Sequence, residues 1–120
     1  MRNSRVQIGI QKWGADYPAA STFLQTLFGC RTPQDLSVLY NWSQYCDPRT
    51  EQLIRRGLRL QGSDDPAADT WWARADQRVV DQAGAVPLLN TKQIDLVSRR
   101  VGNHQYNPQW GTLLDQLWVR

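Results

Sequence analysis

The sequence predicts a small α/β fold of short strands and about three helices, and three observations predict it. Residues 6–13 alternate apolar with polar side chains, which is the pattern of a half-buried strand. Two stretches, 47–62 and 65–84, each open with an aspartate and a proline and close at a glycine, which are start and stop signals of helices. The length of 120 residues suits one small domain, so we assign 6–120 to a single domain and 1–5 to an N-terminal extension.

The first strand and the first helix lie on either side of the stretch "GADYP". In residues 6–13 the apolar side chains fall on one face, and "GADYP" ends the strand. Residues 20–28 follow, and their large apolar side chains recur at helical spacing: Phe23, Leu24, Leu27 and Phe28. We expect Ser21 or Thr22 to cap this helix and Gly29 to stop it.

The second helix is expected to begin after Asp47. Asp47 can cap it, Pro48 suits the first helical position, and Glu51 lies in the first turn. Gly62 closes the helix. The residues of its buried stripe are Leu53, Ile54 and Leu58.

The third helix uses the same signals. Asp65 is its expected cap, Pro66 its start and Gly84 its end. One face carries the residues that we expect to be buried: Trp72, Ala75, Val79 and Ala83. Trp71 and Val80 fall on the flank of that face, and the tryptophans are expected to pack this helix against the rest of the fold.

The last third of the chain reads as short strands joined by turns. We predict strands at 85–90 and 93–98, because the first is an apolar run and the second alternates. Turn-forming residues follow: Gly102, Asn103, Asn107, Pro108 and Gly111. The tail 113–119 is apolar, and we expect it to be another strand or a packed end inside a core.

The charge is mildly basic, with a net charge of +3 and a pI of about 9.2. The densest basic stretches are Arg55–Arg56 with Arg59, and Arg99–Arg100, which we expect on the solvated surface. Neither is the basic tract of a nucleic-acid footprint, so no nucleic-acid partner is expected. No apolar run reaches the roughly 18 residues of a membrane span, and the N-terminus lacks the apolar stretch of a signal peptide.

Six tryptophans and two cysteines are the unusual parts of the composition. The tryptophans favour either a contact surface for sugars or peptides or a large packing interface. Cys30 and Cys46 do not have the spacing of a zinc site. They are either two free buried thiols or a disulfide that closes a long loop, and a disulfide implies an oxidising compartment.

The sequence contains no motif of catalysis. It has no glycine-rich phosphate loop, no His-Glu metal pair and no nucleophile elbow. The single histidine, His104, lies among turn residues and is expected to have a surface or packing role. We therefore predict a protein that is not an enzyme and that holds no cofactor and no metal.

Asp16 is the carboxylate whose role the sequence pattern leaves most open, since it follows a predicted strand and stands between Trp13 and Tyr17. Its simplest role is a turn residue that bonds the backbone of the next turn. The stretches "WGADYP", "FLQTLFGC", "YCDPRTEQLI" and "VPLLNTKQIDLVSRRVGNHQYNPQWGTLLDQLWVR" together suggest more. In that order they resemble the C-terminal end of family 5 extracellular solute-binding proteins, the peptide and nickel receptors of bacterial ABC importers, most closely the actinobacterial peptide type.

The resemblance covers about Val6 to Arg120 and implies a role for each motif. The family fold is a two-lobed, periplasmic-binding-protein-like type II receptor, and residues 6–120 would be a fragment of its C-terminal lobe. In peptide-binding members the aspartate of the Trp-x-x-Asp-Tyr motif, here Asp16, pairs with the ligand's α-ammonium, and the tryptophan, here Trp13, lines the side-chain pocket. Tyr17 would shield that ion pair.

The resemblance also implies a partner, a location and a covalent link. Cys30 and Cys46 would be a disulfide-bonded pair in a loop on the ligand side. A receptor of this family lies outside the cytoplasm and docks on the membrane subunits of its importer. The ligand would be a short peptide, although a nickel complex is also found in the family.

Two other hypotheses remain open. Full members of the family have a first lobe and an export signal, which this sequence lacks, so the chain is alternatively a remnant that binds no ligand and self-associates through its exposed lobe surface. A more remote reading is an aromatic-rich carbohydrate binder, in which Trp13, Trp42 and Trp110 stack on sugars.

Overall fold

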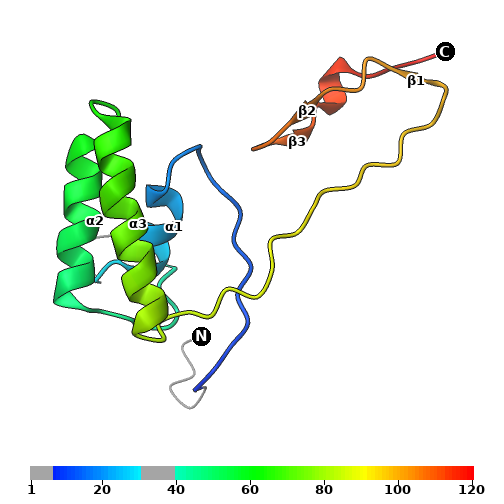
Figure 1. The fold of residues 1–120 in the computed structure, drawn as a ribbon. Coiled ribbons are helices and arrows are strands. Elements are labelled where there is room, and N and C mark those ends of the chain that lie inside the picture. The colour runs from blue at the N-terminus through cyan, green and yellow to red at the C-terminus, as the bar shows by residue number, and fades with distance from the viewer. Residues whose placement is uncertain (1–6, 31–39) are drawn as a thin grey trace. The chain divides into compact units, whose positions relative to one another are not determined.

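The computed structural model describes residues 7–30 and 40–120, and the chain divides into two units, Met1–Pro87 and Leu88–Arg120. The described residues of the first unit contain three α-helices, and the second unit contains four two-residue strands and a 3-10 helix (Figure 1). This mixture of three helices and small antiparallel sheets agrees with a small fold of helices and short strands. Over the described ranges, no helix is both long and apolar enough to cross a membrane.

Helices α2, Pro48–Leu60, and α3, Asp65–Asp81, form an antiparallel pair. The cap predicted for α2 is confirmed, because Asp47 Oδ2 accepts a hydrogen bond of 2.8 Å from the Thr50 N–H. The cap predicted for α3 is wrong by one residue. Asp64 caps this helix by accepting from the Ala67 N–H at 3.1 Å, whereas the Asp65 carboxylate accepts from the Gly62 N–H at 2.7 Å and stabilises the turn before it.

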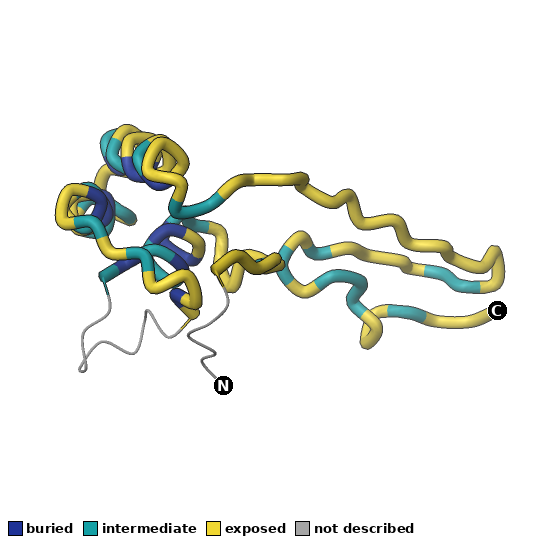
Figure 2. The backbone as a smooth tube through the Cα atoms, turned by 90° about the horizontal axis from the view of Figure 1, so that it is seen from below, coloured by how far each residue is buried: buried dark blue, intermediate teal, exposed yellow. Residues whose placement is uncertain are grey.

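The hydrophobic core lies where the three helices meet (Figure 2). Its central cluster consists of Leu24, Ile54, Ala68, Trp72 and Ala75. Gly57 permits the close approach of α2 and α3, because a Cβ on this residue would lie 2.6 Å from the Trp72 indole. The core is therefore built around one tryptophan packed on one glycine.

Most of the predicted core positions are confirmed, and one is wrong. Trp72, Ala75 and Val79 are buried on α3, as expected. Ala83 is exposed, because α3 ends at Asp81 and Ala83 takes a positive φ of 53° that turns the chain out of the helix.

Helix α1, Ser21–Phe28, confirms the first predicted helix but not its cap. The N-cap residue is Ala20, which makes no side-chain cap hydrogen bond. Ser21 and Thr22 are fully buried inside the first turn, and their hydroxyls bond residues before the helix instead. The helix ends at Gly29, as predicted, and the Gly29 N–H donates to the Gln25 carbonyl at 3.0 Å.

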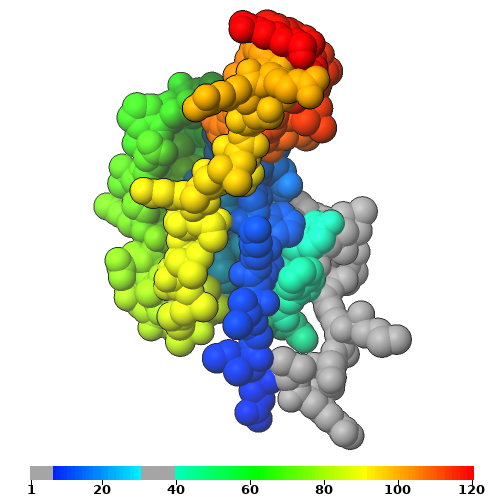
Figure 3. All heavy atoms as spheres, turned by 90° about the vertical axis from the view of Figure 1, so that its right-hand side faces the viewer, coloured from blue at the N-terminus to red at the C-terminus, as the bar shows by residue number. Residues whose placement is uncertain are grey.

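Three of the predicted strands are not formed. Residues 7–13 are extended but unpaired, Ile10 is 91% exposed, and residues 7–12 lie on the surface (Figure 3). Residue 6 lies outside the described residues. Segments 85–90 and 93–98 are likewise extended without pairing, and Leu96 is 97% exposed. A strand needs a neighbour for its backbone hydrogen bonds, and the described residues supply none to these segments.

The second unit consists of two antiparallel strand pairs. Strand β1, Val101–Gly102, pairs with β4, Trp118–Val119, and β2, Tyr106–Asn107, pairs with β3, Gly111–Thr112. The 3-10 helix η2, Leu114–Gln116, precedes β4.

The predicted turns and tail of this unit are partly confirmed. The Asn107 side chain closes the β2–β3 turn by accepting from the backbone of Gln109 and Trp110, and Gly111 has a positive φ of 77°. The tail ends in a strand, but not inside a core. Trp118 is 48% exposed, with its indole over Gly102 and the Arg120 guanidinium over the ring, and Val119 is exposed.

Candidate functional site

The turn from Trp13 to Tyr17 precedes α1 and is fastened to the first turn of that helix. The Thr22 hydroxyl donates to Asp16 Oδ2 at 3.0 Å and accepts from the Asp16 N–H at 3.1 Å. The Ser21 hydroxyl donates to the Tyr17 hydroxyl at 3.0 Å. Both donors are buried, so the helix holds the exposed Asp16 carboxylate in one position at the surface.

An aromatic row connects this turn with the loop before Cys46. The Trp13 ring lies 4.8 Å from the Tyr40 ring between centroids, at an interplanar angle of 52°, and the Tyr40 ring lies 6.3 Å from the Trp42 ring. Both distances are typical of attractive aromatic pairs. Tyr40 and Trp42 are exposed, Trp42 by 60%, and the row therefore offers a contact surface beside the Asp16 turn.

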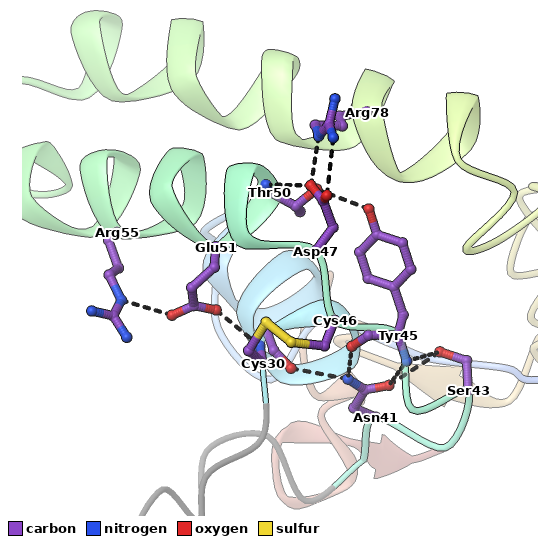
Figure 4. Close-up of a disulfide and its surroundings, with 11 residues drawn as sticks. Cys30, Asn41, Ser43, Tyr45, Cys46, Asp47, Thr50, Glu51, Arg55 and Arg78 are labelled. Atoms are coloured by element: carbon purple, nitrogen blue, oxygen red, sulfur yellow. Dashed lines mark hydrogen bonds and ion pairs between the residues drawn. A yellow bond between two sulfur atoms is a disulfide. The ribbon is translucent and has the colours of Figure 1, made fainter.

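The cysteines form a disulfide, which decides between the two alternatives that the sequence left open. Cys30 and Cys46 are bonded, with their Cα atoms 4.6 Å apart (Figure 4). The Cys30 N–H also donates to Glu51 Oε2 at 2.9 Å, and this carboxylate accepts from Arg55 Nε at 2.7 Å through its other oxygen. The disulfide therefore joins the end of α1 to the start of α2, and it is compatible with a location outside the cytoplasm.

Asn41 organises the loop that carries the aromatic row, and sequence reasoning did not select it. Its side chain is 2% exposed, and Nδ2 donates to the carbonyls of Gly29 at 2.9 Å and Tyr45 at 2.7 Å. Its Oδ1 accepts from the Tyr45 N–H at 3.1 Å (Figure 4). Because Tyr40 and Trp42 are its chain neighbours, these bonds hold the backbone that carries both rings relative to α1. The signal for this role was present as an asparagine between two aromatic residues in a loop bounded by cysteines.

An ion pair joins the start of α2 to the last turns of α3. Arg78 binds the Asp47 carboxylate through both Nε and Nη2, with 2.9 Å from Nη2 to Oδ1 (Figure 4). The hydrogen bond from Arg78, followed by that from the Thr50 N–H, holds the pKa of Asp47 well below its usual range. The same hydrogen bond raises the pKa of Arg78. The pairing of Asp47 with Arg78 was not predicted, because nothing in the sequence relates two positions on different helices.

The second unit carries a small polar network around Asp95. Its Oδ2 accepts from the Thr112 hydroxyl at 3.0 Å and lies 3.8 Å from His104 Nε2. Hydrogen bonds from Gln93 and then Thr112 lower the pKa of Asp95. His104 is exposed, which agrees with the predicted surface role. Over residues 7–30 and 40–120, no group of three or more His, Cys, Asp or Glu side chains is arranged to hold a metal ion.

The structure thus brings some of the predicted site residues together. Trp13, Asp16 and Tyr17 share one turn, and Cys30 is bonded to Cys46. Trp110, which the carbohydrate hypothesis grouped with Trp13 and Trp42, is exposed and belongs to the second unit. Tyr40 and Asn41 are the neighbours of the site that sequence reasoning missed.

Comparison with known proteins adds no relative. No protein-family model, curated protein or solved structure matches the chain.

Proposed function

We propose that this chain is the C-terminal part of a family 5 extracellular solute-binding protein, which captures short peptides for a bacterial ABC importer. The observation that carries the proposal is the exposed Asp16 carboxylate, held by the buried Thr22 hydroxyl. Asp16 would pair with the α-ammonium of the peptide. The motif series described above supports the same assignment, and with it the type II fold in which this chain contributes one wall of the cleft.

The geometry of the turn suits the recognition of an ammonium group. The hydrogen bond from Thr22 orients the Asp16 carboxylate, and an ionised carboxylate is an acceptor-only group that suits the three donors of an ammonium. A fixed carboxylate loses little conformational entropy when it binds a cation. An ammonium also approaches favourably over aromatic faces, and Trp13, Tyr17 and Tyr40 place such faces near the turn.

The aromatic row supports a broad choice of peptide. Tyr40 and Trp42 are exposed, and their backbone is held through Asn41, so they offer an aromatic surface to a ligand side chain. Rigid aromatic surfaces bind side chains of many shapes, because their contacts are not directional. In this proposal the amino end of the peptide is read by charge and its side chains by apolar contact.

The disulfide supports the proposed location. Disulfides persist outside the cytoplasm, where the receptor of an importer must meet its ligand. In the proposed receptor this chain would work with the other lobe and then dock on the membrane subunits of the importer.

A titration followed by amide NMR tests the proposal. The full chain, with its disulfide intact, is titrated with alanine tripeptide and separately with the N-acetylated form of that peptide. We expect the amide signals of Trp13, Asp16 and Tyr17 to shift with the free peptide only, since acetylation removes the ammonium charge.

Matched variants make this titration specific. Asp16→Asn keeps the shape of the side chain, removes its charge and is expected to abolish the shifts. Asp76→Asn removes the same charge from an exposed position on α3 and should leave them unchanged. Equal shifts with both peptides, or shifts that survive Asp16→Asn, would contradict the proposal.

A second candidate function rests on the exposed apolar segments. Exposed apolar side chains lie in extended backbone that has no strand partner among the described residues: Ile8, Ile10, Ile94 and Leu96. Such segments favour addition of a strand from a second copy, which is the alternative of a self-associating remnant without ligand. Sedimentation equilibrium tests it. This alternative would be favoured if the chain forms a dimer but does not bind peptide. The double variant Ile94→Asp with Leu96→Asp should then abolish the dimer.

A further inference from the structure

One flank of the α2–α3 pair forms a shallow groove lined by arginines from both helices. Arg49 and Arg56 of α2 and Arg78 of α3 line one part, and Arg56 and Arg59 line the other part together with Trp71. Arg56 lines both parts. We call this surface the arginine groove and include in it Arg74, which contacts Trp71. None of the residues found to line it is acidic.

Helical spacing explains why these side chains gather. Arg49 and Arg56 are two turns apart on α2, and Trp71, Arg74 and Arg78 follow the same spacing on α3. The buried faces of the two helices lie against each other, so their cationic flanks meet along one side of the pair. The sequence showed basic residues scattered along the chain, and the packing of the two helices concentrates them.

Trp71 holds two of the guanidinium groups close together. The Cζ atom of Arg56 lies 4.6 Å from the centroid of the Trp71 ring, and that of Arg74 lies 5.0 Å from it. Both distances fall within the range of cation–π contacts. The two guanidinium groups are therefore no more than about 10 Å apart, so an anion close to both would be attracted by two positive charges.

The positive charge of the groove is only partly matched within the protein. Arg78 is paired with Asp47, and Arg55, outside the groove, is paired with Glu51. Arg49, Arg56, Arg59 and Arg74 form no ion pair with any of the described residues. Four cations on one surface thus lack a counter-charge from this part of the chain.

We propose that the arginine groove is a binding site for the phosphate group of an anionic ligand. Guanidinium groups offer paired N–H donors that match the oxygens of a phosphate, and a phosphate carries up to two negative charges on several acceptor atoms. A single carboxylate would neutralise less of this surface. The indole of Trp71 keeps Arg56 and Arg74 in place, so the site loses little side-chain freedom on binding.

Titration with pyrophosphate at constant ionic strength tests the site, followed through the Arg Nε–H and Trp indole NMR signals of the full chain. The proposal expects saturable shifts of Arg56, Arg74 and Trp71. The double variant Arg56→Gln with Arg74→Gln should weaken binding about tenfold or more, because it removes two charge-assisted donors. Arg56→Lys with Arg74→Lys keeps the charge but loses the paired donors, and should also bind more weakly than the unaltered chain.

Two controls decide whether the binding is specific. Arg99→Gln with Arg100→Gln removes the same charge from the second unit and should leave the affinity within about twofold, since these residues are not in the groove. Citrate, which has a comparable negative charge on carboxylates, should bind more weakly than pyrophosphate. Equal loss in both double variants, equal affinity for citrate, or shifts that do not saturate would each overturn the proposal. Circular dichroism of each variant confirms that the helices are retained.

The phosphate group has two possible sources, and vesicles distinguish them. Co-sedimentation of the chain with vesicles of anionic phospholipid, but not with vesicles of phosphatidylcholine alone, would identify a lipid headgroup. Binding of pyrophosphate without vesicle binding would identify a soluble phosphate compound. Either result, with loss in Arg56→Gln with Arg74→Gln, supports the site.

Discussion

The two units of this chain use their apolar residues in opposite ways. In Met1–Pro87 the helices bury a continuous cluster around Trp72, whereas none of the residues of Leu88–Arg120 is buried (Figure 2). Both units contain tryptophans and leucines. The difference is that α2 and α3 supply surfaces to each other, while the short strands pair over only two residues each. Apolar patterning therefore produces a core only where a second surface is within reach of the same segment.

Among the substitutions that test this difference between the two units, the loss of Trp72 should have the largest effect. Trp72→Ala removes the centre of the helical core and should destabilise the first unit by about 3–5 kcal/mol, which is a large part of a small domain's stability. Thermal unfolding followed by far-UV circular dichroism measures it. Trp118→Ala is the matched substitution in the second unit and should leave the helical signal unchanged. Equal losses from the two variants would mean that the units do not differ as described.

The disulfide comes next in expected size. Replacing both cysteines by serine opens the loop between Cys30 and Cys46 and should cost roughly 3 kcal/mol in the chain-entropy model. A denaturant titration of the oxidised chain and the double variant gives the difference. A double variant as stable as the oxidised chain would show that Asn41 and the helix packing hold this loop without the covalent link.

A smaller effect is expected from one methyl group between the helices. Gly57→Ala places a Cβ 2.6 Å from the Trp72 indole, so α2 must move away and the fold should lose about 1–3 kcal/mol. Gly9→Ala is the control, because nothing lies within 4 Å of a Cβ at that position. Urea unfolding gives the free energy of unfolding of the two variants. If Gly57→Ala is as stable as the unaltered chain, α2 and α3 do not approach each other closely at Gly57.

The pH dependence of the first unit should be the smallest of these effects. The pKa of Asp47 is lowered in the folded chain by Arg78 and the Thr50 N–H, so its stabilisation is fully present above the ordinary aspartate pKa of about 4 and is lost as the pH falls further. The melting temperature should therefore drop between about pH 4 and pH 2. Asp47→Asn should melt lower at neutral pH and change less over that range; an unchanged acid profile would contradict the ion pair.

The sequence predicted the local structure of the helices well because the signals are local. The aspartate and proline at the start of α2 act within one turn, and the cap formed as expected. Two adjacent aspartates stand where α3 begins, and the pattern does not say which of them caps; Asp64 is the cap and Asp65 the first helical residue, so the choice of Asp65 was wrong. At α1 the hydroxyls of Ser21 and Thr22 were assigned to the cap, but burial directs them to Tyr17 and Asp16.

The features that the sequence did not predict depend on contacts between distant residues. Arg78 finds Asp47 across two helices, Asn41 bonds Gly29 across the disulfide loop, and the cationic flank appears only when α2 packs on α3. The strands that were predicted but did not form show the same dependence on contacts with distant residues. Residues 7–13 and 93–98 have the alternation of strands, but alternation does not supply a partner.

The most direct test of the central claim is a thermodynamic cycle between Asp16 and the amino group of a peptide. Isothermal titration gives the affinity of the full chain and of Asp16→Asn for a free tripeptide and for its N-acetylated form. The proposed ion pair predicts a coupling of about 2 kcal/mol or more, so that Asp16→Asn costs roughly thirtyfold in affinity for the free peptide and little for the acetylated one. A cost that is the same for both peptides would show that Asp16 acts only on its own turn, and the claim that it reads the amino end of a ligand would be wrong.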